Sequence, residues 1–188
     1  MGLDMYLYCN SRPMVQEIHK DSPYGDYITD WYRKTGVAVY WRKANAIHKW
    51  FVDNVQDGKD DCGIYEVEFE QLKRLRDTCK KVLDGCKLVD GKVRNGSTWQ
   101  GGEWIDIYEQ GKVMTNAELA HELLPTQAGF FFGSQDYDQY YYEDIKWTYE
   151  QLDLIIKRLY KVEESFWSYA VHPYETDWYV TFHYHSSW

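Results

Sequence analysis

Long hydrophobic stretches are missing from this chain of 188 residues. No apolar run comes near the roughly 20 residues that cross a bilayer, so no membrane-spanning segment is predicted. The first ten residues, MGLDMYLYCN, carry neither the basic segment nor the small-residue cleavage site of a signal peptide. The four cysteines show no CxxC spacing, which argues against a zinc knuckle or a redox pair and is typical of buried thiols in a reducing compartment. These absences predict a cytoplasmic protein.

Catalytic motifs are missing as well. The sequence contains no GxSxG, P-loop, HExxH or GxGxxG pattern, so it carries no signal of a hydrolase, an NTPase or a dinucleotide enzyme. The acidic stretch DGKDDCG at 57–63 lacks the order of ligands that an EF-hand needs. No cofactor is predicted. The sequence therefore gives no support for an enzyme and leaves the question open.

Aromatic residues, by contrast, are abundant: 9 Trp, 18 Tyr and 7 Phe. Tyr and Trp combine a large apolar area with a polar group, which suits half-buried surfaces and interfaces. Two interpretations follow. Either the aromatic residues fill the core, or some of them form an exposed contact surface.

Negative charge is concentrated toward the end of the chain. The net charge is −9, and residues 115–188 hold 12 Asp and Glu against 4 Lys and Arg. We expect an acidic lobe there, which disfavours direct binding of duplex DNA. An acidic lobe suits a basic protein partner, although charge also serves solubility.

Strand-like and helix-like segments alternate along the chain. This order predicts a single α+β domain with a mixed sheet packed by three to four helices. Residues 10–35 are expected to be a long loop, and a capping box at 115–118 is expected to open a short helix. Residues 84–114 are expected to form a hairpin-rich insertion, with turns at Asp90-Gly91 and Gln110-Gly111. The expected strands are 3–8, 36–41, 64–67, 129–134 and a C-terminal strand over 178–185, and the longer expected helices are 43–55, 69–83 and 138–162.

The helix expected over 138–162 has a second aromatic stripe away from its core face. Tyr140, Trp147 and Leu154 recur at intervals of seven residues, and Glu143 and Glu150 lie beside them. One interpretation is that the C-terminal strand or the insertion covers this stripe. The other is that the stripe is an acidic, aromatic surface that binds a partner.

The second candidate site is the junction between strand 36–41 and helix 43–55. A helix N-terminus that follows a strand favours anions, and cations there reinforce the effect. The candidate pocket residues are Trp41, Arg42, Lys43, Asn45 and His48. His48 lies in the middle of an apolar helix face, where it can be either a hydrogen-bonded core residue or a catalytic base.

His183 and His185 project from one face of the expected C-terminal strand. Two imidazoles at this spacing can share a metal ion, with Glu175 or Asp177 as a further ligand. Because a zinc site needs three or four converging ligands, we expect polar side chains exposed to solvent rather than a metal site.

Four segments taken together resemble a family of proteins without an assigned activity, found on phages, prophages and other mobile elements of bacteria. They are MGLDMYL at the start, YWRKANAIHKWFV at 40–52, VQDGKDDCG at 55–63 and LLPTQAGFFFGS at 123–134. The resemblance implies an accessory phage protein, and many such proteins counter host defence.

The leading hypothesis is therefore an acidic, anti-CRISPR-like inhibitor that binds a defence nuclease in the bacterial cytoplasm, with carboxylates occupying a channel built for nucleic acid. The alternative is a nucleotide-binding protein or metal-dependent enzyme with its pocket near Arg42 and His48. A structural or regulatory phage protein is the third possibility.

Overall fold

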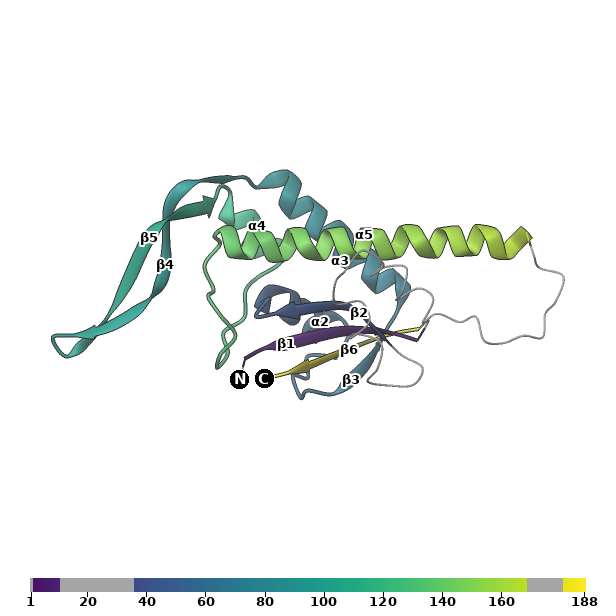
Figure 1. Ribbon diagram of the computed structural model, residues 1–188, viewed down its shortest axis with the longest axis horizontal. Helices are drawn as coiled ribbons and strands as arrows, with labels where there is room; N and C mark the ends of the chain where they lie inside the picture. The colour runs from purple at the N-terminus through teal and green to yellow at the C-terminus, as the bar shows by residue number, and fades with distance from the viewer. Residues whose placement is uncertain (1, 11–35, 169–180) are drawn as a thin grey trace.

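The computed structural model describes residues 2–10, 36–168 and 181–188 (Figure 1). The loop expected over 10–35 and the start of the expected C-terminal strand, with Trp178 and Val180, lie outside this part of the chain, apart from Asn10. So do Glu175 and Asp177, the expected partners of the two histidines.

A four-stranded sheet forms the centre of the fold. Its order is β2 (Gly36–Arg42), β1 (Asp4–Cys9), β6 (Phe182–Ser187) and β3 (Ile64–Val67). The first and last strands of the chain are neighbours, with Asp4 opposite Ser187. The single α+β domain is confirmed. All described strand pairs are antiparallel, so the expected mixed sheet was wrong.

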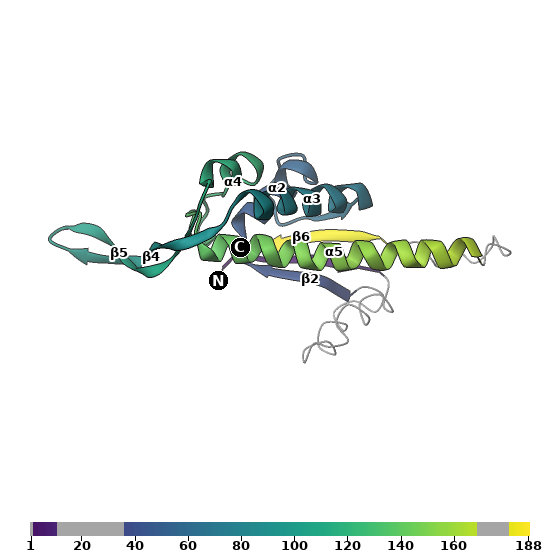
Figure 2. The same ribbon diagram turned by 90° about the horizontal axis from the view of Figure 1, so that it is seen from above.

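Three helices pack around this sheet. Helix α2 (Asn45–Asn54) lies on one face, where the ring of Phe51 stacks on that of Tyr184 with centroids 4.0 Å apart. Helix α3 (Phe69–Gly85) lies on the same side, and α5 (Gln139–Ser168) runs beside α3 along the edge strand β2 (Figure 2). Trp41 on β2 donates its indole N–H to the hydroxyl of Thr148 on α5 at 2.8 Å. Among the described strands β2 lies at the edge of the sheet, and this contact joins it to α5.

The acidic segment 115–188 is not a lobe of its own. It supplies α4 (Ala117–Leu123), α5 and the inner strand β6. Its described carboxylates lie on α4, just before α5 and on α5, and β6 carries none. Among the described residues, none of the helices is both long enough and apolar enough to cross a bilayer.

The expected capping box before α4 was wrong. Asn116 is the N-cap, with a φ of 52°, and makes no capping hydrogen bond with its side chain. The polar groups nearby hold the start of β4 instead: the hydroxyl of Thr115 accepts the backbone N–H of Lys87 at 3.0 Å, and Asn116 Nδ2 donates to the carbonyl of Gly85 at 3.3 Å. A capping box is found at α3, between Glu68 and Gln71.

Residues 88–114 form one long hairpin, which we call the arm. It consists of β4 (Leu88–Gln100) and β5 (Glu103–Met114) and projects from the body (Figure 1). The chain turns at Gly101-Gly102, where φ is 64° and 93°. The two expected hairpins were therefore wrong. Gly91 and Gly111 face each other across the ladder, where a Cβ on either would lie under 3 Å from a cross-strand valine side chain.

Candidate functional site: exposed aromatics and a cavity at the start of α5

The stripe on α5 is partly exposed. Tyr140 is 50% and Trp147 45% exposed, whereas Leu154 is half-buried. Of the two elements expected to cover it, β6 lies inside the sheet, and the arm approaches only the start of α5 before it points away from the body. Trp147 donates its indole N–H to the carbonyl of Tyr40, which brings a further exposed ring from β2. We call Tyr40, Tyr140 and Trp147, with the exposed Glu143 and Glu150, the α5 surface.

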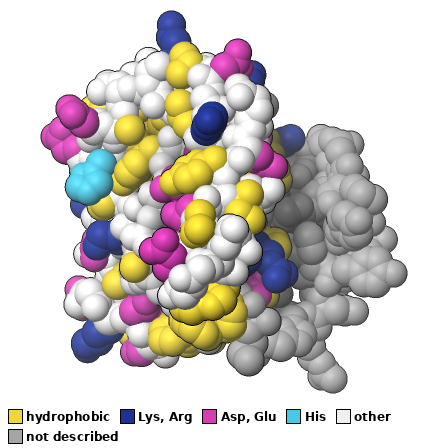
Figure 3. Space-filling view, turned by 90° about the vertical axis from the view of Figure 1, so that its left-hand side faces the viewer, with side chains coloured by type: hydrophobic (Ala, Val, Ile, Leu, Met, Phe, Trp, Pro, Cys, Tyr) yellow, Lys and Arg dark blue, Asp and Glu magenta, His cyan; other side chains and the backbone are white. Residues whose placement is uncertain are grey.

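The arm carries a second exposed aromatic group that the sequence analysis missed. Trp99 and Trp104 face each other beside the turn, with ring centroids 5.5 Å apart, and are 59% and 68% exposed. Tyr108 is exposed on the same face of β5 as Trp104, and Ile105 and Ile107 are exposed on the opposite face. Figure 3 views the molecule from the side of the arm, and apolar side chains there lie among acidic and basic ones. The signal was present in the sequence, as two Trp residues flanking a Gly-Gly turn.

His48 is a hydrogen-bonded core residue. It is completely buried, with Nδ1 2.8 Å from the hydroxyl of Tyr184 and Nε2 3.0 Å from Oδ2 of Asp60. Burial lowers the pKa of His48, and the hydrogen bond and charge of Asp60 oppose this only in part. The imidazole is therefore neutral near pH 7. Trp41 is buried too, so of the five residues proposed at the junction Arg42 and Lys43 are the two at the surface.

The side chain of Asn45 forms hydrogen bonds to a segment that was expected to be a central strand and is a loop. Its Nδ2 donates to the carbonyls of Phe132 (3.2 Å) and Ser134 (2.7 Å), and its Oδ1 accepts the backbone N–H of Gln127 at 3.3 Å. Residues 129–133, which we call the Phe loop, form no described strand. Phe132 is buried, whereas Phe130 is 82% exposed and Phe131 has a φ of 69°, which a bulky side chain rarely adopts.

Replacing Asn45 with alanine is expected to lower the free energy of unfolding by about 1.5 kcal/mol, because two carbonyls and one N–H lose their partner. Hydrogen exchange at the amides of 127–134 should become faster, as urea titration and exchange mass spectrometry can show. Asn54→Ala is the control, since Asn54 is on the same helix and its side chain makes one described hydrogen bond, to the carbonyl of Trp50. Equal losses of unfolding free energy in the two variants would show that the hydrogen bonds of Asn45 do not stabilise this loop.

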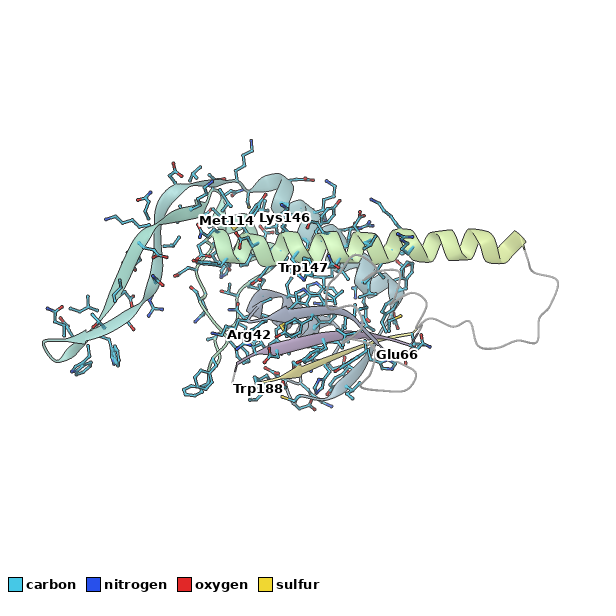
Figure 4. The ribbon with its side chains drawn as sticks, viewed as in Figure 1. Arg42, Glu66, Met114, Lys146, Trp147 and Trp188 are labelled. Carbon is cyan, nitrogen blue, oxygen red and sulfur yellow. The ribbon has the colours of Figure 1, made fainter. Side chains whose placement is uncertain are left out.

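A cavity of about 570 Å³ lies between the arm and the start of α5. Arg42, Lys43 and Asn45 line it from the junction, and Arg94 lines it from β4. Figure 4 shows Arg42 at the end of β2 nearer the arm. Trp41 and His48 do not line it. The other charged or aromatic lining residues are Asp136, Asp138, Tyr140, Tyr141, Glu143 and Asp144.

The four carboxylates of this cavity have no ion-pair partner among the described residues, whereas Arg94 pairs with Asp106 at 2.7 Å and Arg42 lies 3.9 Å from Asp4. Asp138 is 2% exposed and caps α5, with Oδ1 accepting the N–H of Tyr140 at 2.9 Å. Its Oδ2 is buried without a hydrogen-bond partner.

Asp144 shows the same electrostatic imbalance. Burial, followed by the charges of Glu143 and Asp138, raises its pKa to about 7. A lining with four carboxylates beside three cations does not favour the phosphate of a nucleotide, which was the alternative expected at this junction.

The two histidines of β6 lie on the face of the strand away from Tyr184, both partly buried. The rings of Tyr6 and Tyr8 lie 6.1 and 6.4 Å from that of His185, whose pKa is lowered by burial. In the described part of the chain, no group of three or more His, Cys, Asp or Glu side chains is arranged to hold a metal ion.

Comparison with protein-family models, with curated proteins and with solved structures finds no match for this chain.

Proposed function

We propose that the chain acts by binding a protein partner through the arm and the α5 surface. One observation carries this proposal: Trp99 and Trp104 on the arm, and Tyr140 and Trp147 on α5, are each about half exposed or more. Exposed aromatic groups of this kind are typical of interfaces, where Trp and Tyr supply much of the binding energy.

The partner we propose is a nucleic-acid-processing defence complex of a bacterial host, such as a CRISPR effector. The resemblance to phage-borne proteins motivates this choice, and the net charge of −9 agrees with it. Glu143 and Glu150 border the aromatic side chains of the α5 surface and would face the basic channel that holds nucleic acid. The charges would speed association, and the aromatic side chains, once buried in the interface, would slow dissociation.

Inhibition of nucleic-acid cleavage by purified effectors tests the proposal. The double variant Trp99→Ser/Trp104→Ser is expected to inhibit at least about tenfold less well, because interface tryptophans are the costliest to truncate. Its melting temperature should stay close to that of the wild type, since both side chains are more than half exposed. If the wild-type chain inhibits none of a panel of effectors, the defence role is wrong.

Charge reversal tests whether inhibition depends on these two carboxylates or only on the net charge of the chain. Glu143→Lys/Glu150→Lys should weaken inhibition. Glu66→Lys/Glu122→Lys is the matched control, because it makes the same change in net charge at two exposed positions on other elements. Equal losses in the two double variants would show that only net charge matters, and no loss in either would show that the mimicry mechanism is wrong.

A further inference from the structure

The cavity at the start of α5 has an arrangement of charge that calls for a cation. Asp136, Asp138, Glu143 and Asp144 all come from one short segment, and none of them has a described ion-pair partner. Like charges held close together and partly out of water raise one another's free energy, and a bound cation relieves that repulsion.

The cations that line the same cavity do not supply this relief. Arg94 is held by Asp106 on the neighbouring strand, and Arg42 lies beside Asp4. Lys43 also lines the cavity, and none of the three cations is among the causes of the shift in the pKa of Asp144. The acidic wall thus stays uncompensated beside residues of opposite charge.

Two further observations indicate an organic cation. Asp138 Oδ2 is a buried acceptor without a partner, although its residue lines the cavity. The half-exposed ring of Tyr140 lies on the same wall, and aromatic faces attract guanidinium and ammonium groups. A metal ion is disfavoured, because the described carboxylates do not converge as a group of metal ligands.

We infer that this cavity binds the guanidinium or ammonium group of an arginine or lysine side chain presented by the protein partner. The inference rests on the proposed function for the source of the side chain, and on the cavity alone for its chemistry. Arginine suits the site best, because its planar fork can contact two carboxylates and stack on a tyrosine ring at once. The volume of about 570 Å³ leaves room for the side chain and part of its backbone.

Calorimetric and NMR titration of the full chain with N-acetyl-arginine amide tests the cavity without any partner. We expect a dissociation constant on the order of millimolar, as is usual for so small a ligand. N-acetyl-citrulline amide has nearly the same shape without the charge and should bind at least about tenfold more weakly. Asp144→Asn should weaken the arginine amide about tenfold, while Glu122→Gln, an exposed residue on α4, should leave it unchanged.

A pH series adds a second readout. Binding should strengthen between pH 6 and 8 as Asp144 loses its proton, with Asp136, Asp138, Glu143, Arg42, Lys43 and Arg94 as the other charged groups around it. In Asp144→Asn this dependence should be largely absent.

Three results would overturn the inference. They are equal binding of the citrulline amide, unchanged binding in Asp144→Asn, and preferential binding of a nucleoside monophosphate. Micromolar binding of the free amine agmatine would overturn the assignment to a side chain and indicate a small-molecule site. Because no effector is present, these results are independent of the inhibition assays. If the wild-type chain binds the arginine amide but inhibits none of the effectors, the proposed partner is wrong and the cation site stands.

Discussion

Replacement of His48 by leucine is expected to lower the free energy of unfolding by about 3 kcal/mol near pH 7.5. Leucine fills much of the same volume but cannot hydrogen-bond. The hydroxyl of Tyr184, in a residue with no exposed area, would lose the imidazole as its acceptor, and Asp60 would lose one of its donors. Buried polar groups left without partners cost about 1–3 kcal/mol each. For a domain of this size the melting temperature should fall by about 6–12 °C.

The direction of these hydrogen bonds makes the prediction specific. A carboxylate accepts only, so Nε2 carries the proton and donates to Asp60, and Nδ1 accepts from the Tyr184 hydroxyl. Tyr184→Phe removes the hydroxyl, and the double variant with His48→Leu should cost clearly less than the sum of the two single variants. Urea titration measures all three. A loss below about 0.5 kcal/mol in His48→Leu would contradict the role in the core.

The pH dependence supplies an independent check. Burial lowers the pKa of His48, so the folded state keeps the imidazole neutral while the unfolded state takes up a proton below its ordinary value of 6.5. The wild type is therefore expected to lose stability as the pH falls from about 7 to 5. The His48→Leu variant should lose less over the same range.

Local patterns in the sequence were sufficient to predict the helices and strands that have one row of buried apolar side chains. Of the five apolar positions that were expected to face the core on α3, Leu72, Leu75, Cys79 and Val82 are buried and Leu83 is partly buried. Strand β3 begins and ends where it was expected. The same holds for α2, where His48 lies among the apolar residues of its buried face. In these elements the preference of the chain and its tertiary surroundings agree.

The Phe loop shows where local patterns fail. Three consecutive phenylalanines between glycines are typical of a central strand. In the structure, Asn45 donates hydrogen bonds to the carbonyls of Phe132 and Ser134, more than 80 residues later in the chain. These carbonyls therefore do not pair with a neighbouring strand. Such a distant hydrogen-bond partner leaves no trace in the local sequence.

The cavity could be predicted only in part. The strand–helix junction indicated Arg42 and Lys43, because both follow a strand and precede a helix. Its acidic wall comes from the start of α5, and Arg94 comes from the arm. Their approach depends on how the base of the hairpin joins the body, where the backbone N–H of Lys112 donates to Oε1 of Gln139 and Val113 pairs with Asp138. These contacts join segments that are far apart in the sequence, so no local pattern indicates them.

Replacement of Asp144 by asparagine is expected to raise the free energy of unfolding by about 2 kcal/mol at pH 8. The pKa of this carboxyl is raised from 3.8 to about 7 by burial and by Glu143 and Asp138. A difference of that size corresponds to roughly 4 kcal/mol of unfavourable free energy when the group is ionised. About half of it should be recovered, because the side chain keeps some contact with water and asparagine must still bury a polar amide.

The direction in which stability changes with pH follows from the protons bound by the folded and unfolded states. Between pH 4 and 7 the folded state holds a proton on Asp144 that the unfolded state has lost, so this carboxyl lowers the stability as the pH rises through that range. The advantage of Asp144→Asn should therefore be small at pH 4, grow toward pH 7 and then stay constant. Urea titration of the wild type and the variant at pH 4, 6 and 8 measures it. A constant difference at all three values would show that Asp144 is not the titrating group.

Asp153→Asn on the same helix is the matched control and should have the opposite sign. Burial raises the pKa of Asp153, but hydrogen bonds and charges from Lys157 and Arg76 outweigh burial and hold it below 3.8. Its replacement should lower the stability by about 1 kcal/mol at pH 8, and the loss should shrink in acid. The same substitution is thus expected to stabilise the fold at one position of α5 and to destabilise it at another. A carboxylate that lowers the stability of the fold, beside a cavity with an unpartnered acceptor, agrees with the cation site proposed above. Weaker arginine-amide binding together with higher stability in Asp144→Asn would join both properties to one side chain.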